Sequence, residues 1–412
     1  MNEAVENGGG GVAPLRVAWV TINFPLPSET FAAVDLRSLL ASGCMMTVHA
    51  MRAPHRDAAR LSSERGTAAV RVTYKSWGGL AGLRWAARHP CGAVGLLGRV
   101  LAWGWKDPRH LVVGLVAMPR AMAIMEEIEG IRPQVVHLFW GHYPSLVGYL
   151  VSRRLPGTVL TMFLGAYDLS RAYPGSSWLS RRVKQVFTHA RANLPDLQAM
   201  GVPGDRVRVV YRGLDPELLA RPPVGDRRRG RILLAARLVP GKGVDDAITA
   251  LSLLRRSLPV AHLVVLGDGP ERGRLHAHAH ALGLADGVEF AGHIPQQRLF
   301  AEMSCAEAFV LLSHKDGERL PNAVKEAMAV GTVPVVADSP GMSELITHGV
   351  DGMIVPPRDP GAAAAALLAV LSDPDRRGEM ATAAQATVRG RFSAAVAMRE
   401  YVEVWRRASA AD

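Results

Sequence analysis

Short apolar runs with strand character alternate with helix-like segments along most of this chain. In the first half such runs occupy residues 16–24, 46–51, 70–74, 134–139, 158–163 and 207–211. The pattern restarts in the second half, with runs at residues 232–236, 262–266, 288–291, 308–312 and 333–337. Strands that alternate with helices are typical of a parallel sheet covered by helices on both faces. The sequence therefore predicts two doubly wound α/β units.

The two series are separated by residues 221–230 (RPPVGDRRRG), which have no apolar periodicity. We interpret this segment as a linker between a first domain, residues 14–220, and a second, residues 231–392. At 412 residues the chain is longer than one hydrophobic core usually supports. Residues 1–13 are typical of a flexible lead, and residues 393–412 predict a helix that packs back towards the first domain. Two Rossmann-like domains joined in this way place a cleft between them, a common location for ligands.

Cysteine usage and hydropathy favour a cytoplasmic protein. Cys44, Cys91 and Cys305 lie far apart, without a spacing typical of metal or redox sites, as expected in a reducing compartment. The start of the chain lacks the basic and apolar stretches of a signal peptide. A membrane-spanning helix needs about 18 consecutive apolar residues, and the nearest candidate, residues 111–118, is too short. We therefore expect no membrane span.

Positive charge is concentrated in the first half of the chain. Residues 1–212 hold 25 Lys and Arg against 13 Asp and Glu, a net charge of +12, and the remainder carries −1. Such asymmetry favours an anionic partner: nucleic acid, an acidic lipid surface or a phosphorylated substrate. The alternative is a solvated arginine-rich surface.

Tryptophans are interleaved with cations in this half of the chain, and this favours an acidic lipid surface among the three partners. Interfacial helices present tryptophans and cationic side chains to anionic lipid. The alternative is that these tryptophans pack inside the first domain. The residues concerned are Trp77, Trp85, Trp103 and Trp105, among Arg84, Arg88, Arg99, Lys106 and Arg109.

The motif with the clearest chemical meaning spans residues 316–335 (DGERLPNAVKEAMAVGTVPV). A predicted strand ends in this polar loop, and Pro321 predicts the first turn of a following helix, where a missing N–H costs little. The free N–H groups and partial positive charge of that helix N-terminus suit a pyrophosphate. Glu318 before the helix and Glu326 near its middle suit the paired hydroxyls of a sugar or ribose.

A second motif, residues 236–243 (ARLVPGKG), follows the predicted strand at residues 232–236 and precedes a helix-like segment. It places Arg237 and Lys242 at a strand-to-helix turn. Two cations at such a turn, beside a helix terminus, suit a group that carries negative charge. The histidines within residues 276–280 have no Asp, Glu or Cys nearby to complete a metal site. We interpret them as an exposed run and predict no metal.

Together these segments resemble the signature of the family 4 glycosyltransferases, in which two glutamates flank a Pro and precede Ala-Met-Ala-x-Gly-x-Pro-Val. The resemblance covers about residues 16–407 and is strongest in the second half. It implies the GT-B fold, with two Rossmann-like domains that face a central cleft. It also implies metal-independent, retaining transfer of a sugar from a nucleotide diphosphate donor, for which a UDP- or GDP-sugar is expected. No cofactor and no nucleic-acid partner are expected.

The resemblance assigns roles to individual residues. Glu318 would contact the donor sugar near its reacting ring, with Arg237 and Lys242 on the diphosphate as further catalytic groups. Glu326 would bind the nucleotide ribose. Arg319 stands where the family usually has Gly. Further donor-binding residues implied by the resemblance are Leu320, Pro321, Asn322, Gly267 and Ile294, the last beside the nucleobase pocket.

The first half matches the family less regularly. Residues 24–31 (FPLPSETF) resemble a loop of the branch that builds surface polysaccharides of the colanic-acid type, where the loop borders the acceptor and the donor phosphates. The alternative is that Ser28 or Thr30 caps the next helix. Leu164 stands where many members have a histidine that backs the reacting sugar, so the acid/base support is left open. The candidates on the acceptor and sugar side are Ser28, Glu29, His137, His142 and Asp168.

The leading hypothesis is a glycosyltransferase of exopolysaccharide or lipid-linked glycan biosynthesis, cytoplasmic and peripheral at the inner face of the membrane. One alternative keeps the donor chemistry but uses a soluble small-molecule acceptor. A non-catalytic sugar-nucleotide binding protein and a dinucleotide-dependent oxidoreductase are less favoured. The oxidoreductase requires Gly-x-Gly-x-x-Gly after the first strand, where this chain has Pro-Leu-Pro.

Overall fold

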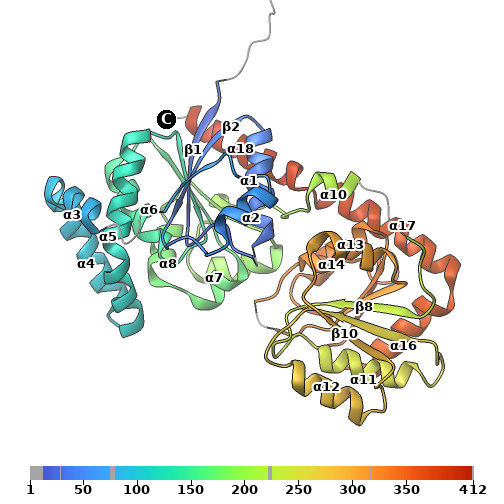
Figure 1. Ribbon diagram of the computed structural model, residues 1–412. Helices are drawn as coiled ribbons and strands as arrows, with labels where there is room; N and C mark the ends of the chain where they lie inside the picture. The colour runs from blue at the N-terminus through green and yellow to red at the C-terminus, as the bar shows by residue number, and fades with distance from the viewer. Residues whose placement is uncertain (1–12, 28, 75–78, 221–224, 316, 411–412) are drawn as a thin grey trace, which may run out of the picture. The chain divides into compact units, whose positions relative to one another are not determined.

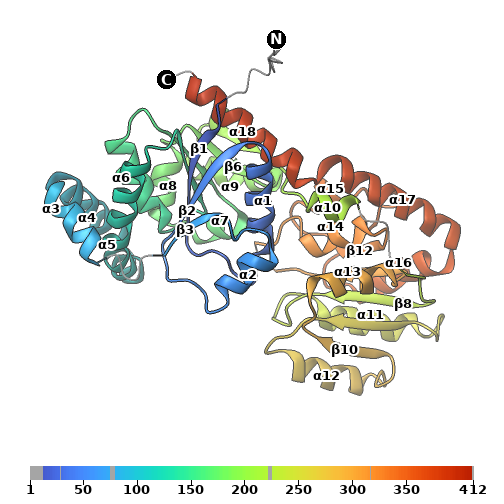
Figure 2. The same cartoon turned by 45° about the horizontal axis from the view of Figure 1, so that its top comes forward.

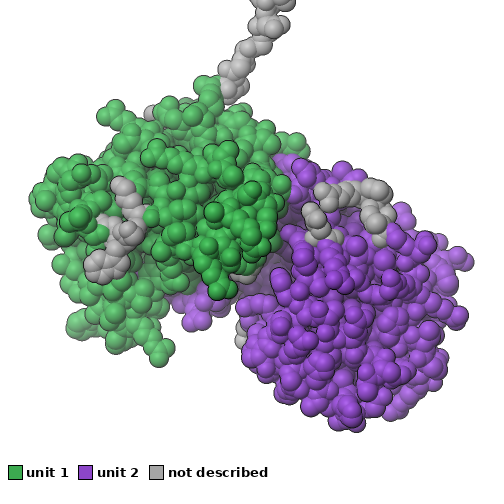
Figure 3. Space-filling model, in the orientation of Figure 1, with its two compact units in different colours: residues 1–163, 174–185, 398–412 green, residues 164–173, 186–397 purple. Residues whose placement is uncertain are grey.

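The computed structural model describes residues 13–27, 29–74, 79–220, 225–315 and 317–410 (Figure 1). Five features of the sequence therefore lie wholly or partly outside the described residues: the N-terminal lead, Ser28, Trp77, the linker and Asp316, the first residue of the motif at 316–335. The chain forms two compact units (Figure 3). Unit 1 comprises residues 1–163, 174–185 and 398–412, and unit 2 comprises residues 164–173 and 186–397.

The first sheet is parallel and has seven strands in the order β3-β2-β1-β4-β5-β6-β7. Every residue of β4 and β5 is buried, as expected for central strands that helices cover on both faces. The short strand β6 was not predicted, because only two of its four residues, Val186 and Phe187, are apolar. The strands are β1 (Leu15–Thr21), β2 (Cys44–Ala50), β3 (Arg71–Thr73), β4 (Val135–Phe139), β5 (Val159–Phe163), β6 (Gln185–Thr188) and β7 (Val207–Val209).

The helices between these strands begin with α1, which follows the loop of residues 24–31. Its N-cap is Glu29, whose side chain makes no capping hydrogen bond, so the alternative that Thr30 caps this helix is wrong. Thr30 is instead the first helical residue. The helices are α1 (Thr30–Ala41), α2 (Ala58–Glu64), α3 (Gly79–Arg88), α4 (Pro90–Gly104), α5 (Pro108–Ile131), α6 (Pro144–Arg154), α7 (Ala166–Arg171), α8 (Pro174–Ser180), α9 (Leu194–Ala199) and α10 (Pro216–Ala220).

The second sheet is parallel and has six strands in the order β10-β9-β8-β11-β12-β13. Alternate residues of β8 point to opposite faces: Ile232 and Leu234 belong to one core and Leu233 to the other. Helices therefore cover both faces, and the prediction of two doubly wound sheets is confirmed. The strands are β8 (Arg231–Ala235), β9 (His262–Leu266), β10 (Val288–Gly292), β11 (Ala308–Leu311), β12 (Val333–Ala337) and β13 (Met353–Val355).

Seven helices accompany this sheet in the described part of the chain, and an eighth, α18, ends it. They are α11 (Val244–Leu254), α12 (Arg272–Ala281), α13 (Gln296–Ser304), α14 (Asn322–Ala329), α15 (Met342–Leu345), α16 (Pro360–Ser372), α17 (Pro374–Arg391) and α18 (Ala394–Ala410). None of the helices in the described ranges is both long enough and apolar enough to cross a bilayer.

Most of α18, from Met398 onward, belongs to unit 1 and packs on its sheet (Figure 2). Trp405 is fully buried, and its indole Nε1 donates a hydrogen bond to Thr161 Oγ1 on β5 at 3.1 Å. The rings of Tyr401 and Trp405 contact the His137 ring on β4, with centroids 5.5 and 5.4 Å away. The end of the chain is thus part of the core that its beginning forms.

Candidate functional site

The loops that follow β8, β9 and β11 lie together at the carboxyl edge of the second sheet. Leu238 N donates a hydrogen bond to Asp268 O at 3.0 Å, which joins the loop after β8 to the turn after β9. Gly243 has a φ of 65°, and a Cβ at this position would lie 2.0 Å from Leu312 O, just beyond β11. Only glycine allows so close an approach. The two sequence motifs are therefore neighbours in space.

Lys242 and Glu318 come from these two motifs and form an ion pair. Lys242 Nζ lies 2.5 Å from Glu318 Oε1, and the two side chains are only 16% and 15% exposed. The other carboxylate oxygen of Glu318 accepts a hydrogen bond from Ser313 Oγ. Charge-assisted hydrogen bonds on both oxygens hold this carboxylate in one orientation.

Glu326 lies on α14 and is buried. Gln296 Nε2 donates to its Oε1 at 3.5 Å, which is a long hydrogen bond. Burial raises the pKa of this carboxyl from 4.5 to about 7, against smaller opposing effects of Gln296 and Lys325. A ligand that donates hydrogen bonds to this buried carboxyl would stabilise its ionised form.

The helix N-terminus near Pro321 forms as predicted, with one difference in detail. Pro321 is the N-cap, with extended φ and ψ of −61° and 133°, and α14 begins at Asn322. Leu320, before it, is buried and has a φ of 32°. The Asn322 side chain accepts a hydrogen bond from Lys325 Nζ at 3.3 Å, so its amide faces its own helix.

The remaining predicted donor-side residues surround this centre less closely. Arg237 is exposed, and its side chain makes no hydrogen bond or ion pair with any residue that the structure describes. Gly267 has a φ of 136° and approaches Ala236 O so closely that a Cβ would lie 1.9 Å from it, so its role here is to let two loops meet. Ile294 is half-buried against a core of unit 2.

The residues of unit 1 that were candidates for the acceptor and sugar side lie in its core or next to the end of a helix or strand. The His137 ring is buried, shares a hydrogen bond with Thr161 Oγ1 at 2.9 Å and contacts the Trp19 ring. His142 has a φ of 31° and is half-buried. Glu29 is half-buried at the start of α1.

Asp168 belongs to unit 2 and closes the first turn of α7. Its side chain is buried, and its Oδ2 accepts a hydrogen bond from Gly165 N at 3.0 Å. This contact satisfies a backbone donor at the helix start. Asp168 therefore stabilises the start of α7, and His137 packs in the core of unit 1, so both residues have a structural role.

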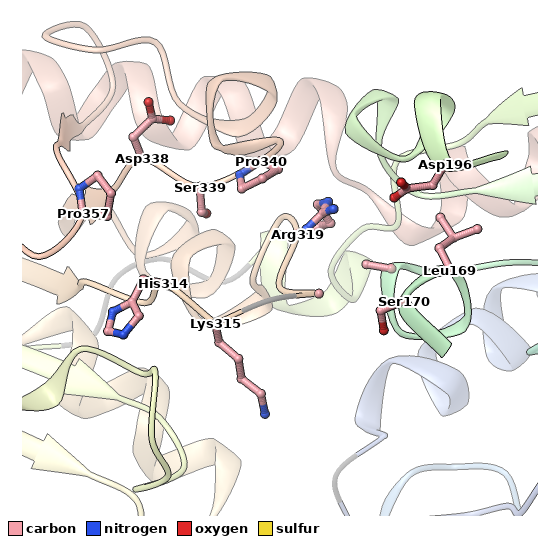
Figure 4. A pocket seen from close by; sticks show the side chains of 12 residues that line it. Leu169, Ser170, Asp196, His314, Lys315, Arg319, Asp338, Ser339, Pro340 and Pro357 are labelled. Atoms are coloured by element: carbon pink, nitrogen blue, oxygen red, sulfur yellow. The ribbon is translucent and has the colours of Figure 1, made fainter. Parts of the chain in front are cut away.

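A cavity of about 400 Å³ in unit 2 lies between α7 and the loop after β11 (Figure 4). Its wall includes Leu169 and Ser170 of α7 and, from the loop, His314, Lys315 and Arg319. Arg319 Nη1 donates to Glu318 O at 3.1 Å, whereas its buried Nε has no hydrogen-bond partner among the described residues. The side chain that replaces the family's usual Gly therefore brings a cation to the wall of this cavity.

The sequence of this chain is similar to those of known glycosyltransferases. The family model for glycosyl transferases group 1 matches residues 223–387. The amylovoran biosynthesis glycosyltransferase AmsK of Erwinia amylovora is 31% identical over 295 residues, which are 67% of this chain and 71% of AmsK. This chain belongs to the group 1 glycosyltransferases. WcaL of Salmonella typhimurium, named for colanic acid biosynthesis, is 27% identical over 86% of this chain and 90% of its own length.

Solved structures confirm the GT-B fold of this glycosyltransferase. HepE of Anabaena in complex with UDP superposes with a TM-score of 0.73 at 17% identity, over 95% of this chain and all of HepE. Sucrose-phosphate synthase of Thermosynechococcus elongatus gives a TM-score of 0.71 at 16% identity, over 97% and 100%. At such identities the likeness concerns the fold.

Several side chains of this glycosyltransferase's site were not predicted from the sequence. Ser313 and Gln296 bind the two glutamates, and Lys315 and Asp338 line the cavity. Ser313, Lys315 and Asp338 follow β11 or β12, so the rule that ligands bind outside the carboxyl ends of strands could have found them. Gln296 has no such signal, because α13 reaches Glu326 only through tertiary packing.

The raised pKa of Glu326 predicts a stability that depends on pH. The folded state keeps a proton that the unfolded chain releases near pH 4.5, so stability falls as pH rises from about 4.5 to 7 and stays lower above. Glu326→Gln should remove this effect. We expect wild type to lose about 2.5 kcal/mol more than the variant between about pH 5 and pH 8 in denaturant unfolding. Equal losses would contradict this, and the exposed Glu289→Gln serves as control.

Proposed function

We propose that this protein is a retaining glycosyltransferase of the family 4 type that uses a nucleotide diphosphate sugar and needs no metal. The observation that carries this proposal is the ion pair of Lys242 with Glu318 beside the N-terminus of α14. A cation and a carboxylate side by side suit the two ends of a sugar phosphate: the cation binds the phosphate, and the carboxylate accepts from the sugar hydroxyls.

Donor binding would exchange the partners of both charges. Lys242 would turn to the diphosphate, and Glu318, released from it but still held by Ser313, would accept hydrogen bonds from the sugar. Arg237 is exposed and has no side-chain partner among the described residues, so it can add a second cation. Hydroxyls of the ribose would donate to Glu326 and lower its raised pKa, because they favour the ionised form.

The chemistry proposed is front-face displacement at the anomeric carbon. The bond from C1 to the leaving phosphate oxygen breaks, the acceptor oxygen bonds to C1 on the same face, and its proton passes to the departing phosphate. Lys242, Arg237 and the N–H groups at the start of α14 stabilise the charge that develops on that phosphate. Because the leaving group takes the proton, this route needs no basic side chain at Leu164.

The comparisons support a sugar nucleotide as donor and a polysaccharide as product. HepE, which shares the fold, has been solved with UDP and with UDP-glucose, and AmsK and WcaL are named for amylovoran and colanic acid biosynthesis. We infer that this protein acts on the cytoplasmic side, on a glycan or lipid-linked acceptor of exopolysaccharide biosynthesis, with a UDP- or GDP-sugar as donor.

The test starts with thermal shift and hydrolysis assays against UDP-, GDP- and dTDP-sugars. We expect one class of donor to stabilise the protein and to be hydrolysed slowly, with or without EDTA. NMR of the transfer product should show the anomeric configuration of the donor, and an inverted linkage would exclude retention. Glu318→Ala should abolish turnover while Glu289→Ala keeps it. If Glu318→Ala turns over like wild type, the site is elsewhere.

A further inference from the structure

Helices α4 and α5 of unit 1 form an antiparallel hairpin whose seam is set by glycines. A Cβ at Gly104 would lie 2.5 Å from Leu111 Cα, and a Cβ at Gly114 would lie 2.9 Å from Val100 Cγ1. The pairs 104–111 and 100–114 define the antiparallel register. Figure 1 shows this hairpin, with α3, at the outer margin of unit 1.

One face of this hairpin is apolar and exposed. In each helix, the residue one position after a contact residue is rotated by about 100° around the helix axis. Because the two helices are antiparallel, both rotations lead to the same side of the seam. Leu97, Leu101 and Trp105 of α4 and its turn stand there at 39, 47 and 85% exposure. Val112 and Leu115 of α5 stand beside them at 58 and 39%. We call these five side chains the hairpin face.

The tryptophans named in the sequence analysis are divided between core and surface. Trp85 is fully buried, and its Nε1 donates to Glu129 Oε2 at 2.9 Å. Trp103 is buried, and its ring contacts the ring of Tyr149. The hypothesis that they form an interfacial surface is therefore wrong for these two residues. Trp105 is exposed, and aliphatic side chains make up the rest of the apolar surface.

Cations without internal partners border the hairpin face at its turn. Lys106 and Arg109 are exposed, and their side chains form no ion pair in the described part of the chain. Elsewhere in the region the arginines are engaged: Arg84 and Arg88 pair with Glu126. Exposed positive charge, with the carboxylate of Asp107 between the two cations, therefore lies next to the exposed apolar side chains.

We propose that the hairpin face docks the protein on an anionic lipid surface. Trp105 and its aliphatic neighbours enter the boundary between head groups and acyl chains, and Lys106 and Arg109 bind lipid phosphates. A patch of contiguous apolar side chains marks an interaction site. The adjacent cations favour anionic lipid over a second copy of the chain, because two copies that meet face to face bring like charges together. This proposal does not depend on the sugar-transfer chemistry.

Flotation of the full-length protein with vesicles tests the proposal. We expect the protein to float with phosphatidylcholine vesicles that hold about 30 mol % phosphatidylglycerol, and far less with phosphatidylcholine alone. Raising NaCl from about 50 to 500 mM should release much of it. Equal flotation with neutral and anionic vesicles, or none with either, would overturn the proposal.

Two variants locate the contact. Leu101→Ser with Trp105→Ser should weaken vesicle binding at least about tenfold, because two large apolar side chains are lost. Lys106→Glu with Arg109→Glu should abolish the preference for anionic lipid. Val350→Ser, an equally exposed apolar residue of unit 2, is the matched control and should float like wild type. Unchanged thermal unfolding and donor hydrolysis would show that the variants are folded.

The outcomes that contradict the assignment are equally specific. If both hairpin variants float like wild type, the membrane contact lies elsewhere. If light scattering instead shows a dimer that the Leu101→Ser, Trp105→Ser variant converts to a monomer, the hairpin face is an interface between two copies. Either result would overturn lipid docking through this face.

Discussion

Replacing Lys242 with Ala is expected to lower kcat/KM for sugar transfer by about 10²–10³-fold, the usual effect of removing one preorganised group that stabilises transition-state charge. The side chain of Lys242 is only 16% exposed, so water screens its charge little, and the exposed Arg237 replaces it only in part. The measurement is initial rate against donor concentration. Because the charge develops as the leaving group departs, most of the loss should fall on kcat.

Two variants control this prediction. Lys242→Arg keeps the charge and should recover part of the rate. Lys184→Ala removes an exposed lysine of unit 1 and should leave the rate unchanged. A Lys242→Ala protein that unfolds like wild type and transfers sugar within a factor of about three of it would show that the leaving phosphate is bound elsewhere.

The second large effect concerns stability. Trp405→Ala should lower the free energy of unfolding by about 3–5 kcal/mol, because it leaves a large cavity beside β4 and β5. It also removes the hydrogen bond to Thr161 and the ring contact with His137. Denaturant unfolding followed by circular dichroism measures this change.

The control is Glu403→Ala, two residues earlier on α18. Its side chain is 63% exposed and pairs with Arg407 at 3.6 Å, so its loss should change stability by less than about 0.5 kcal/mol. If Trp405→Ala were as stable as Glu403→Ala, the end of α18 would not be part of the first core.

The strands and helices that the sequence predicted well are those with strong local patterns. β9 and β12 have the predicted bounds, because their apolar runs are flanked by turn residues. β6 and β13 were missed, because only two residues of β6 are apolar and the three residues of β13 run directly into two prolines. They form because neighbouring strands supply hydrogen-bond partners, which is a property of the sheet.

The candidate site likewise combines features that the local sequence predicts with features that depend on tertiary packing. The motifs place Glu318, Glu326 and Lys242 in loops after strands and at a helix start, and parallel strands bring such loops to one edge. The pairing of Lys242 with Glu318 is not local, since 76 residues separate them. The same holds for Gln296, which reaches Glu326 from another helix, and for the cavity that Arg319 lines.

By itself the sequence determined two doubly wound units, the motifs at their strand ends and the excess of positive charge in the first half. Those features depend on neighbours along the chain, through periodicity, turn residues and composition. Only the tertiary structure decided that Trp85 and Trp103 are buried while Leu101 and Trp105 are exposed. Periodicity shows that a helix has an apolar face, but whether another element covers that face depends on contacts distant in sequence.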